Sequence, residues 1–124
     1  MPIEGQRYTR EQIAAAHGGS PIEFLPSVSG RVVCACLRTD PAYNPEAPRV
    51  ILPGRGRRRE QTAAVLRRQR DAIPIYIKQV PNAWKFVGFY EVENSTQARA
   101  EIARYEKQTR RGVTSVIYMR KVRG

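Results

Sequence analysis

Histidine and cysteine are scarce in this chain, which has one histidine and two cysteines in 124 residues. A structural zinc site takes four ligands, almost always from these residue types. The chain therefore lacks the ligands for such a site, and we expect Cys34 and Cys36 to be buried thiols on one face of a strand. There is also no glycine-rich cofactor fingerprint, so we predict neither a metal nor a cofactor.

Long apolar runs are also missing. No run approaches the roughly 20 residues of a membrane-spanning helix. The N-terminal segment MPIEGQRYTREQ lacks the apolar stretch of a signal peptide. We therefore expect a cytoplasmic protein without a membrane partner.

Catalytic groups are few. A Ser/His/Asp triad would depend on the lone His17, which falls in the last turn of a predicted helix, where a cation favours the helix dipole. We found no carboxylate pair with the spacing of a metal-dependent nuclease. The sequence therefore predicts no catalytic residues, and a role other than catalysis is favoured.

Acidic residues are half as numerous as basic ones, 11 against 22, and the formal net charge is +11. This imbalance favours a polyanionic partner, most often nucleic acid. The alternative is a soluble basic protein without such a partner. The hydrophobic content of 41% excludes a disordered tail and suits a single domain over residues 1–124.

The apolar periodicity predicts three helices and five strands in the order α, β, β, α, β, β, α, β. Thr9 and Gln12 form a capping box for the first helix, and Asn94 or Ser95 would cap the last. The helices are expected over 8–19, 59–70 and 94–112, and the strands over 31–39, 49–52, 73–80, 84–92 and 113–122. Strands that are apolar on both faces favour an α+β fold with a small mixed five-stranded β-barrel. An open five-stranded sheet is the main alternative, with a single crossover in the middle.

A cluster of arginines follows the glycine turn at Pro53-Gly54, where a predicted strand gives way to a helix. The start of a helix offers free backbone N–H groups and partial positive charge, and arginine forks bind phosphate in a bidentate manner. This arrangement predicts a clamp on a phosphate backbone, although a solvated arginine run is the alternative. The predicted nucleic-acid contacts are Arg55, Arg57, Arg58, Arg59, Arg67, Arg68 and Lys85.

Aromatic and polar residues at the ends of elements could shape a pocket for a base. Trp84 begins a strand, and Tyr43 lies in a proline-rich loop with Asp40 and Asn44. Aromatic rings stack on unpaired bases, and carboxylate and amide groups bond to base edges. The alternatives are that the rings belong to the core and that Asp40 and Asn44 begin turns. We predict a base pocket formed by these four residues.

The runs NPEAPRVILPGRG, IPIYIK and WKFVGFYEV resemble PUA-like domains, and they are most similar to the SRA-like modules attached to modification-dependent restriction enzymes. Residues 50–54 match a strand that closes on a glycine turn, and Trp84, Phe86 and Gly88 match an aromatic-x-aromatic-x-Gly strand. The resemblance covers roughly residues 31–122. It implies a small β-barrel that binds nucleic acid and holds a flipped, modified base in a concave pocket.

The chain departs from the eukaryotic SRA signature, which has acidic residues after the glycine turn where this chain has arginines. Pocket residues are therefore not carried over from that signature. No nuclease domain is present, so a separate nuclease or effector partner is expected. The main hypothesis is a reader of DNA. The alternatives are a small hydrolase of a modified nucleoside, using Lys78 or Lys85 with a glutamate, and an RNA-binding accessory protein.

Overall fold

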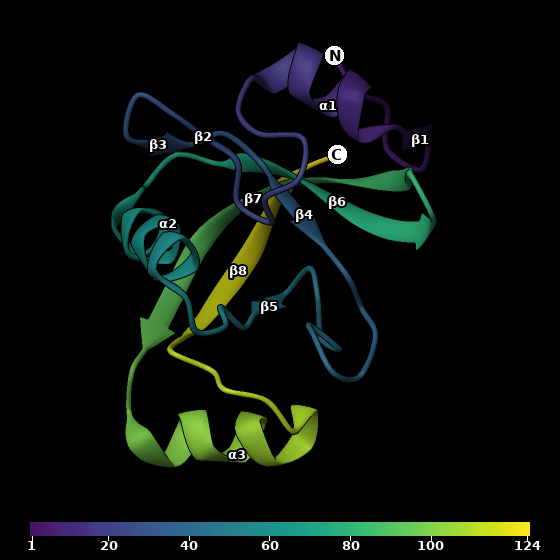
Figure 1. Cartoon of the computed structure of the whole chain (residues 1–124). Coiled ribbons are helices and arrows are strands. Elements are labelled where there is room, and N and C mark those ends of the chain that lie inside the picture. Colours follow the sequence, from purple (N-terminus) through teal and green to yellow (C-terminus); the bar gives the residue numbers. More distant parts are fainter.

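The computed structural model describes residues 1–124 and contains three helices and eight strands, which confirms the α+β class (Figure 1). The helices are α1 (Arg10–His17), α2 (Arg57–Arg68) and α3 (Arg99–Thr109). The strands are β1 (Arg7–Tyr8), β2 (Ser27–Val28), β3 (Arg31–Val32), β4 (Ala35–Leu37), β5 (Val50–Ile51), β6 (Ile73–Val80), β7 (Ala83–Thr96) and β8 (Val116–Arg123). None of the helices combines the length and the apolar character needed to cross a bilayer.

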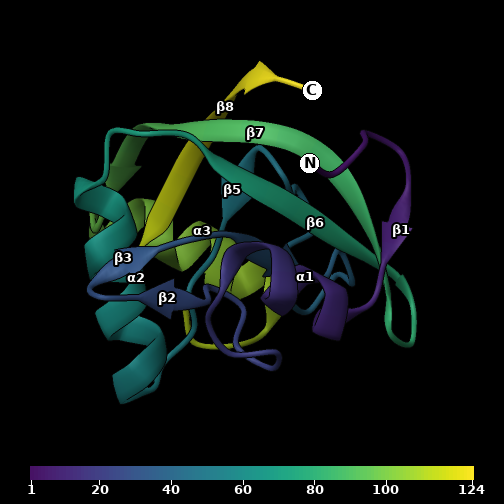
Figure 2. The same cartoon turned by 90° about the horizontal axis from the view of Figure 1, so that it is seen from above.

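The main sheet follows the order β4-β6-β7-β8-β5, and β1 pairs with the start of β7. All neighbours are antiparallel except β4 and β6, which are parallel. The end strands β4 and β5 are not paired with each other, so the five-strand path is open rather than a closed barrel. Strands β2 and β3 form a separate two-stranded hairpin that lies beside α2 (Figure 2).

The connection from β4 to its parallel neighbour β6 contains β5 and α2. This confirms the single crossover expected in the middle of the chain. A helix in such a crossover runs back along the sheet, so it begins near the edge where the parallel strands end. The start of α2 and the carboxyl ends of β4 and β6 therefore lie at one edge.

The two sides of the central hairpin support different helices. Strand β6 directs Ile73, Ile75 and Ile77 into a cluster with Ala63 and Leu66 of α2. Its alternate residue Tyr76 joins a second cluster beneath α1, as the period of two in a strand requires. The members of this second cluster are Ile13, Cys34, Cys36, Tyr76, Trp84, Phe86 and Phe89. A third cluster holds α3 against β5 and β8.

Cys34 and Cys36 are both buried and unpaired, as the sequence predicts. A side-chain hydrogen bond with Cys36, together with burial, raises the pKa of the Cys34 thiol. Cys34 is therefore a protonated core residue.

Helix α1 begins at the Thr9 capping box and ends at Gly18, as predicted. Two other expectations were wrong. The strand expected over 31–39 is split, because Ser29 and Gly30 have positive φ values and turn Arg31–Val32 back onto β2. Asn94 and Ser95 do not cap α3, because they pair with β8 and extend β7 to Thr96.

Gly88 lies at a bulge in β7, opposite the register shift between Ile75 and Tyr76. Its φ is 122°, and a Cβ atom there would lie 2.8 Å from the carbonyl oxygen of Arg123. Both the backbone conformation and the close approach therefore require glycine at this position.

We expect Gly88→Val to lower the free energy of unfolding by about 3 kcal/mol, because strain and overpacking each cost about 1–3 kcal/mol. Urea denaturation measures this loss. Gly5→Val is the matched control, since Gly5 also has a positive φ but nothing lies within 4 Å of its Cβ position. Equal losses in the two variants would show that close approach at Gly88 contributes nothing.

Candidate functional site

A cleft of about 930 Å³ opens at the sheet edge where β4 and β6 end. Arg38 follows β4, Lys78 lies near the end of β6, and the start of α2 forms the opposite rim. The lining residues are Arg10, Ile22, Glu23, Phe24, Cys36, Arg38, Tyr43, Asn44, Leu52, Gly54, Arg55, Gly56, Arg57, Arg58, Arg59, Thr62, Lys78, Trp84, Arg111 and Gly112. The cleft therefore lies between the carboxyl ends of the parallel strands β4 and β6 and the start of the crossover helix α2.

The cleft is strongly cationic. Its lining contains seven arginines and one lysine, and Glu23 is its one carboxylate. Clefts that are lined by one sign of charge concentrate ligands of the opposite sign. The cleft therefore favours a polyanion.

The predicted arginine turn forms one rim of the cleft. Gly56 precedes α2 with a φ of 137° and has no side chain to cap the helix, and its own N–H donates to the Oε2 of Glu60 at 3.1 Å. The first-turn N–H groups of a helix have no partner within the helix, so they remain available as donors. Arg57 and Arg59 are exposed and make no ion pair, and Arg55 is paired only at 3.7 Å with Glu106. This rim can therefore offer backbone donors and guanidinium groups to phosphates together.

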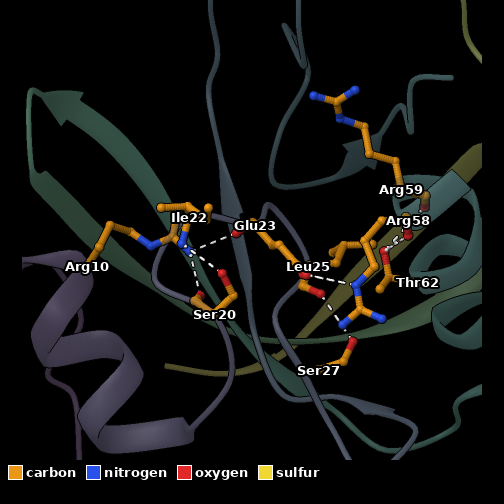
Figure 3. A network of polar contacts seen from close by, with 9 residues as sticks. All are labelled: Arg10, Ser20, Ile22, Glu23, Leu25, Ser27, Arg58, Arg59 and Thr62. Carbon is orange, nitrogen blue, oxygen red and sulfur yellow. Dashed lines mark hydrogen bonds and ion pairs between the residues drawn. The ribbon is translucent and has the colours of Figure 1, made fainter. Parts of the chain in front are cut away.

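Arg58 differs from its neighbours because it is held by Glu23. Its Nε lies 2.8 and 3.1 Å from the two carboxylate oxygens (Figure 3). The hydrogen bond with Glu23 raises the pKa of Arg58 above its ordinary value. In the same view Arg59 points away from Glu23. Arg58 thus neutralises the cleft's carboxylate, which leaves the other cations without an internal partner in the lining.

Arg10 enters the cleft from the first turn of α1 and is only 8% exposed. Its Nη2 donates to the carbonyl oxygens of Ser20 and Glu23 at 3.1 and 2.7 Å (Figure 3). Its Nε is buried without a hydrogen-bond partner, and no carboxylate lies within ion-pair distance. Burial of a cation without a counter-ion costs several kcal/mol. Arg10 is therefore a costly buried charge that a bound anion would stabilise.

Trp84 forms part of the floor of the cleft and also belongs to the core cluster beneath α1. The Cζ of Arg10 lies 5.1 Å from the centroid of its ring, and the Nζ of Lys78 lies 5.9 Å from it. Trp84 and Lys78 are opposite each other in the β6–β7 hairpin. The floor therefore brings two cations to one buried ring.

Tyr43 and Asn44 line the cleft from the proline-rich loop. The Tyr43 ring is exposed, and the guanidinium of Arg38 lies 4.3 Å from its centroid. The Oδ1 of Asn44 accepts from the backbone N–H of Leu52 at 2.8 Å. Asn44 thus fixes the loop, while Tyr43 presents a ring to the cleft.

Arg111 holds this loop in place from the connection between α3 and β8. It donates to the carbonyl oxygens of Ala42, Tyr43 and Leu52 at 2.6 to 2.7 Å. Burial lowers the pKa of Arg111 from its ordinary value. The role of Arg111 is to position Tyr43, because its donors are engaged by the backbone.

The structure thus brings together seven of the eleven predicted site residues, namely Arg55, Arg57, Arg58, Arg59, Tyr43, Asn44 and Trp84. The other four lie outside the lining of the cleft. Asp40 pairs with Arg38 at 2.9 Å, and Arg67 donates to the Oγ of Ser115. Arg68 lines a smaller hollow between α2 and the β2–β3 hairpin, and Lys85 pairs with Arg7 in the sheet.

Sequence reasoning missed Arg10, Glu23, Arg38 and Arg111 as parts of the site. Arg10 reads as an ordinary first-turn residue of an amphipathic helix, and its burial depends on the distant hairpin. The only signal in the sequence was the excess of basic over acidic residues, which could have indicated that further cations line the same cleft. For the hydrolase alternative, the structure places Lys78 in the cleft and Lys85 outside it, and Glu23 is bound to Arg58. No group of three His, Cys, Asp or Glu side chains is placed to hold a metal ion.

Comparison of the chain with protein-family models, with curated proteins and with solved structures found no match in any of the three.

Proposed function

We propose that the chain is a nucleic-acid-binding module, a reader of DNA that grips the phosphate backbone with the rim of α2. The observation that carries the proposal is the cleft lining, where eight cationic side chains face one carboxylate that is already paired. Phosphate contacts supply most of the sequence-independent affinity of such proteins. The first-turn N–H groups of α2 add neutral donors to the guanidinium groups of Arg57 and Arg59.

We further propose that the cleft accepts an unpaired or flipped base, including a modified one. The exposed ring of Tyr43 supports this proposal, because aromatic faces stack on bases that have left the duplex. The chain would then be a divergent PUA-like module of the SRA type. The glycine turn at Gly54 lies on the rim, and the strand with Trp84 and Phe86 runs below the floor.

The test is fluorescence anisotropy with four probes of equal length: plain duplex DNA, duplex DNA with one mismatched or modified base, single-stranded DNA and structured RNA. We expect binding whose logarithm falls linearly with the logarithm of salt concentration, by about 0.9 per phosphate contact on duplex DNA. The altered duplex should bind more tightly than the plain one. A flat salt dependence, or no binding at low salt, would refute the nucleic-acid proposal, and a preference for RNA would replace DNA as the partner.

Tyr43→Ala should selectively weaken binding of the altered duplex, by about 1–3 kcal/mol, which is the usual contribution of stacking on one base. Plain duplex should bind as before, because the Tyr43 side chain carries no charge and phosphate contacts supply most of the sequence-independent affinity. Tyr43→Phe retains the ring and should bind like the unmodified protein. If the Tyr43→Ala and Tyr43→Phe variants discriminate equally well between the two duplexes, the proposal that Tyr43 stacks on a base is wrong.

A further inference from the structure

The floor of the cleft, formed by Trp84 with Arg10 and Lys78, differs in burial from the rim of arginines at the start of α2. The rim arginines are exposed and solvated, whereas Arg10 is buried and Lys78 is half-buried. Neither floor cation makes an ion pair, and no hydrogen bond joins the ammonium group of Lys78 to the rest of the chain. A partly buried cation keeps much more of its field than an exposed one, since water screens it less.

No side chain that lines the cleft is free to neutralise the charges of Arg10 and Lys78. Glu23 is the one carboxylate in the lining, and both of its oxygens are bonded to Arg58. The Trp84 ring compensates the two floor cations only in part, because cation–π contacts contribute about 0.5–2 kcal/mol. Within the chain the charge of Arg10 is met only by neutral groups, namely the carbonyl oxygens of Ser20 and Glu23 and the Trp84 ring. An anion in the cleft would supply the missing countercharge.

The charge of the floor limits what that anion can be. Arg10 and Lys78 both lie at the ring of Trp84, and neither makes an ion pair. A phosphodiester within a strand carries one negative charge, whereas a terminal phosphomonoester carries about −1.5 to −2 at neutral pH. Two unpaired cations therefore match a group that ends a strand better than one that bridges two nucleotides.

From this geometry we infer that the floor of the cleft binds the terminal phosphate of a nucleic-acid strand, held between Arg10 and Lys78. The inference rests on the proposed function and names its substrate class: strands with a phosphorylated end. The rim of α2 holds the backbone that follows, and the floor recognises the end itself.

The experiment compares single strands of one sequence that end in a 5′-hydroxyl, a 5′-phosphate or a 3′-phosphate, each as an unlabelled competitor against one internally labelled strand. We expect one of the phosphorylated ends to compete roughly tenfold better than the hydroxyl end, as one strong charge-assisted contact would produce. The 5′ and 3′ arms decide which end enters. Lys78→Gln should abolish the preference for the phosphorylated end, so that all three strands compete equally for this variant.

Lys85→Gln is the matched control, because Lys85 lies on the neighbouring strand outside the cleft and its loss removes the same charge. Arg10→Lys should reduce the preference as well. Because Arg10 also holds the Ser20–Glu23 loop, the Lys78→Gln variant is the one that tests the inference. Equal competition by all three strands for the unmodified protein would overturn the inference and leave the proposed function intact. Failure of every strand to bind would refute both. Equal displacement by a nucleoside monophosphate would assign the floor to free nucleotides and overturn the strand end.

Discussion

Replacement of Trp84 with alanine is expected to lower the free energy of unfolding by about 3–5 kcal/mol, the usual cost of removing a large buried aromatic side chain. Trp84 is 7% exposed and packs in the cluster beneath α1. Its removal would open a cavity in that cluster and take the ring away from Arg10, which then loses part of its compensation. For a domain of this size, whose total stability is typically about 5–15 kcal/mol, such a loss is severe.

Thermal and urea denaturation measure this loss directly. Trp84→Phe is the matched control, because it retains a buried ring and should lose much less stability. The structure makes Trp84 a poorer platform for a base than Tyr43, since Trp84 is 7% exposed and Tyr43 is 41% exposed. A Trp84→Ala protein that melts with the unmodified protein but fails to prefer an altered duplex would reverse this assignment and make Trp84 a base contact.

The second large effect concerns affinity. We expect Arg55, Arg57 and Arg59, when replaced together by alanine, to weaken nucleic-acid binding by on the order of 100-fold at moderate salt, since each charged contact contributes about 1 kcal/mol or more. The salt slope should fall by about 0.9 for each phosphate contact that is lost. The loss should be equal across sequences, because phosphate contacts carry no base information.

The matched control removes the same charge elsewhere, through Arg7, Arg70 and Arg99, which are exposed, unpaired and outside the cleft. Both triple variants should keep the unmodified melting temperature, since surface substitutions usually change stability by less than about 0.5 kcal/mol. If the two variants lose affinity equally, net charge rather than the rim of α2 explains binding.

Local signals in the sequence were sufficient for much of the fold. The capping box at Thr9 has a physical cause that acts within a few residues, and it is confirmed. The need for glycine at position 88 depends instead on the distant carbonyl of Arg123. The split of the strand expected over 31–39 was missed because the apolar run continues through residues 33 and 34, which belong to no strand. Before them β3 pairs with β2, and after them β4 pairs with β6. Periodicity reports burial, and it does not report which strand is the partner.

The candidate site likewise has one part that the sequence predicts and one part that it does not. The arginine rim is contiguous in the sequence, so its position at the start of α2 could be predicted from the glycine turn. The floor is not contiguous: Arg10 reaches Trp84 only because α1 packs on the hairpin of β6 and β7. No composition or spacing rule connects these two residues. The choice between an open sheet and a closed barrel was likewise decided by long-range strand pairing, which local patterns do not encode.

The pairing of β5 with β8 has a consequence for how the cleft is assembled during synthesis. Val50 and Ile51 meet Tyr118 and Ile117, and the carbonyl of Pro53, just before the arginine turn, accepts from Thr114. The rim therefore depends on residues made more than sixty positions later, and such distant pairing is slow to form. A nascent chain that ends before β8 can form the hairpin of β6 and β7 and pack α2 against it, but the turn before α2 still lacks its contacts with Thr114 and β8. The rim should therefore reach its final position last, after the rest of the sheet has formed.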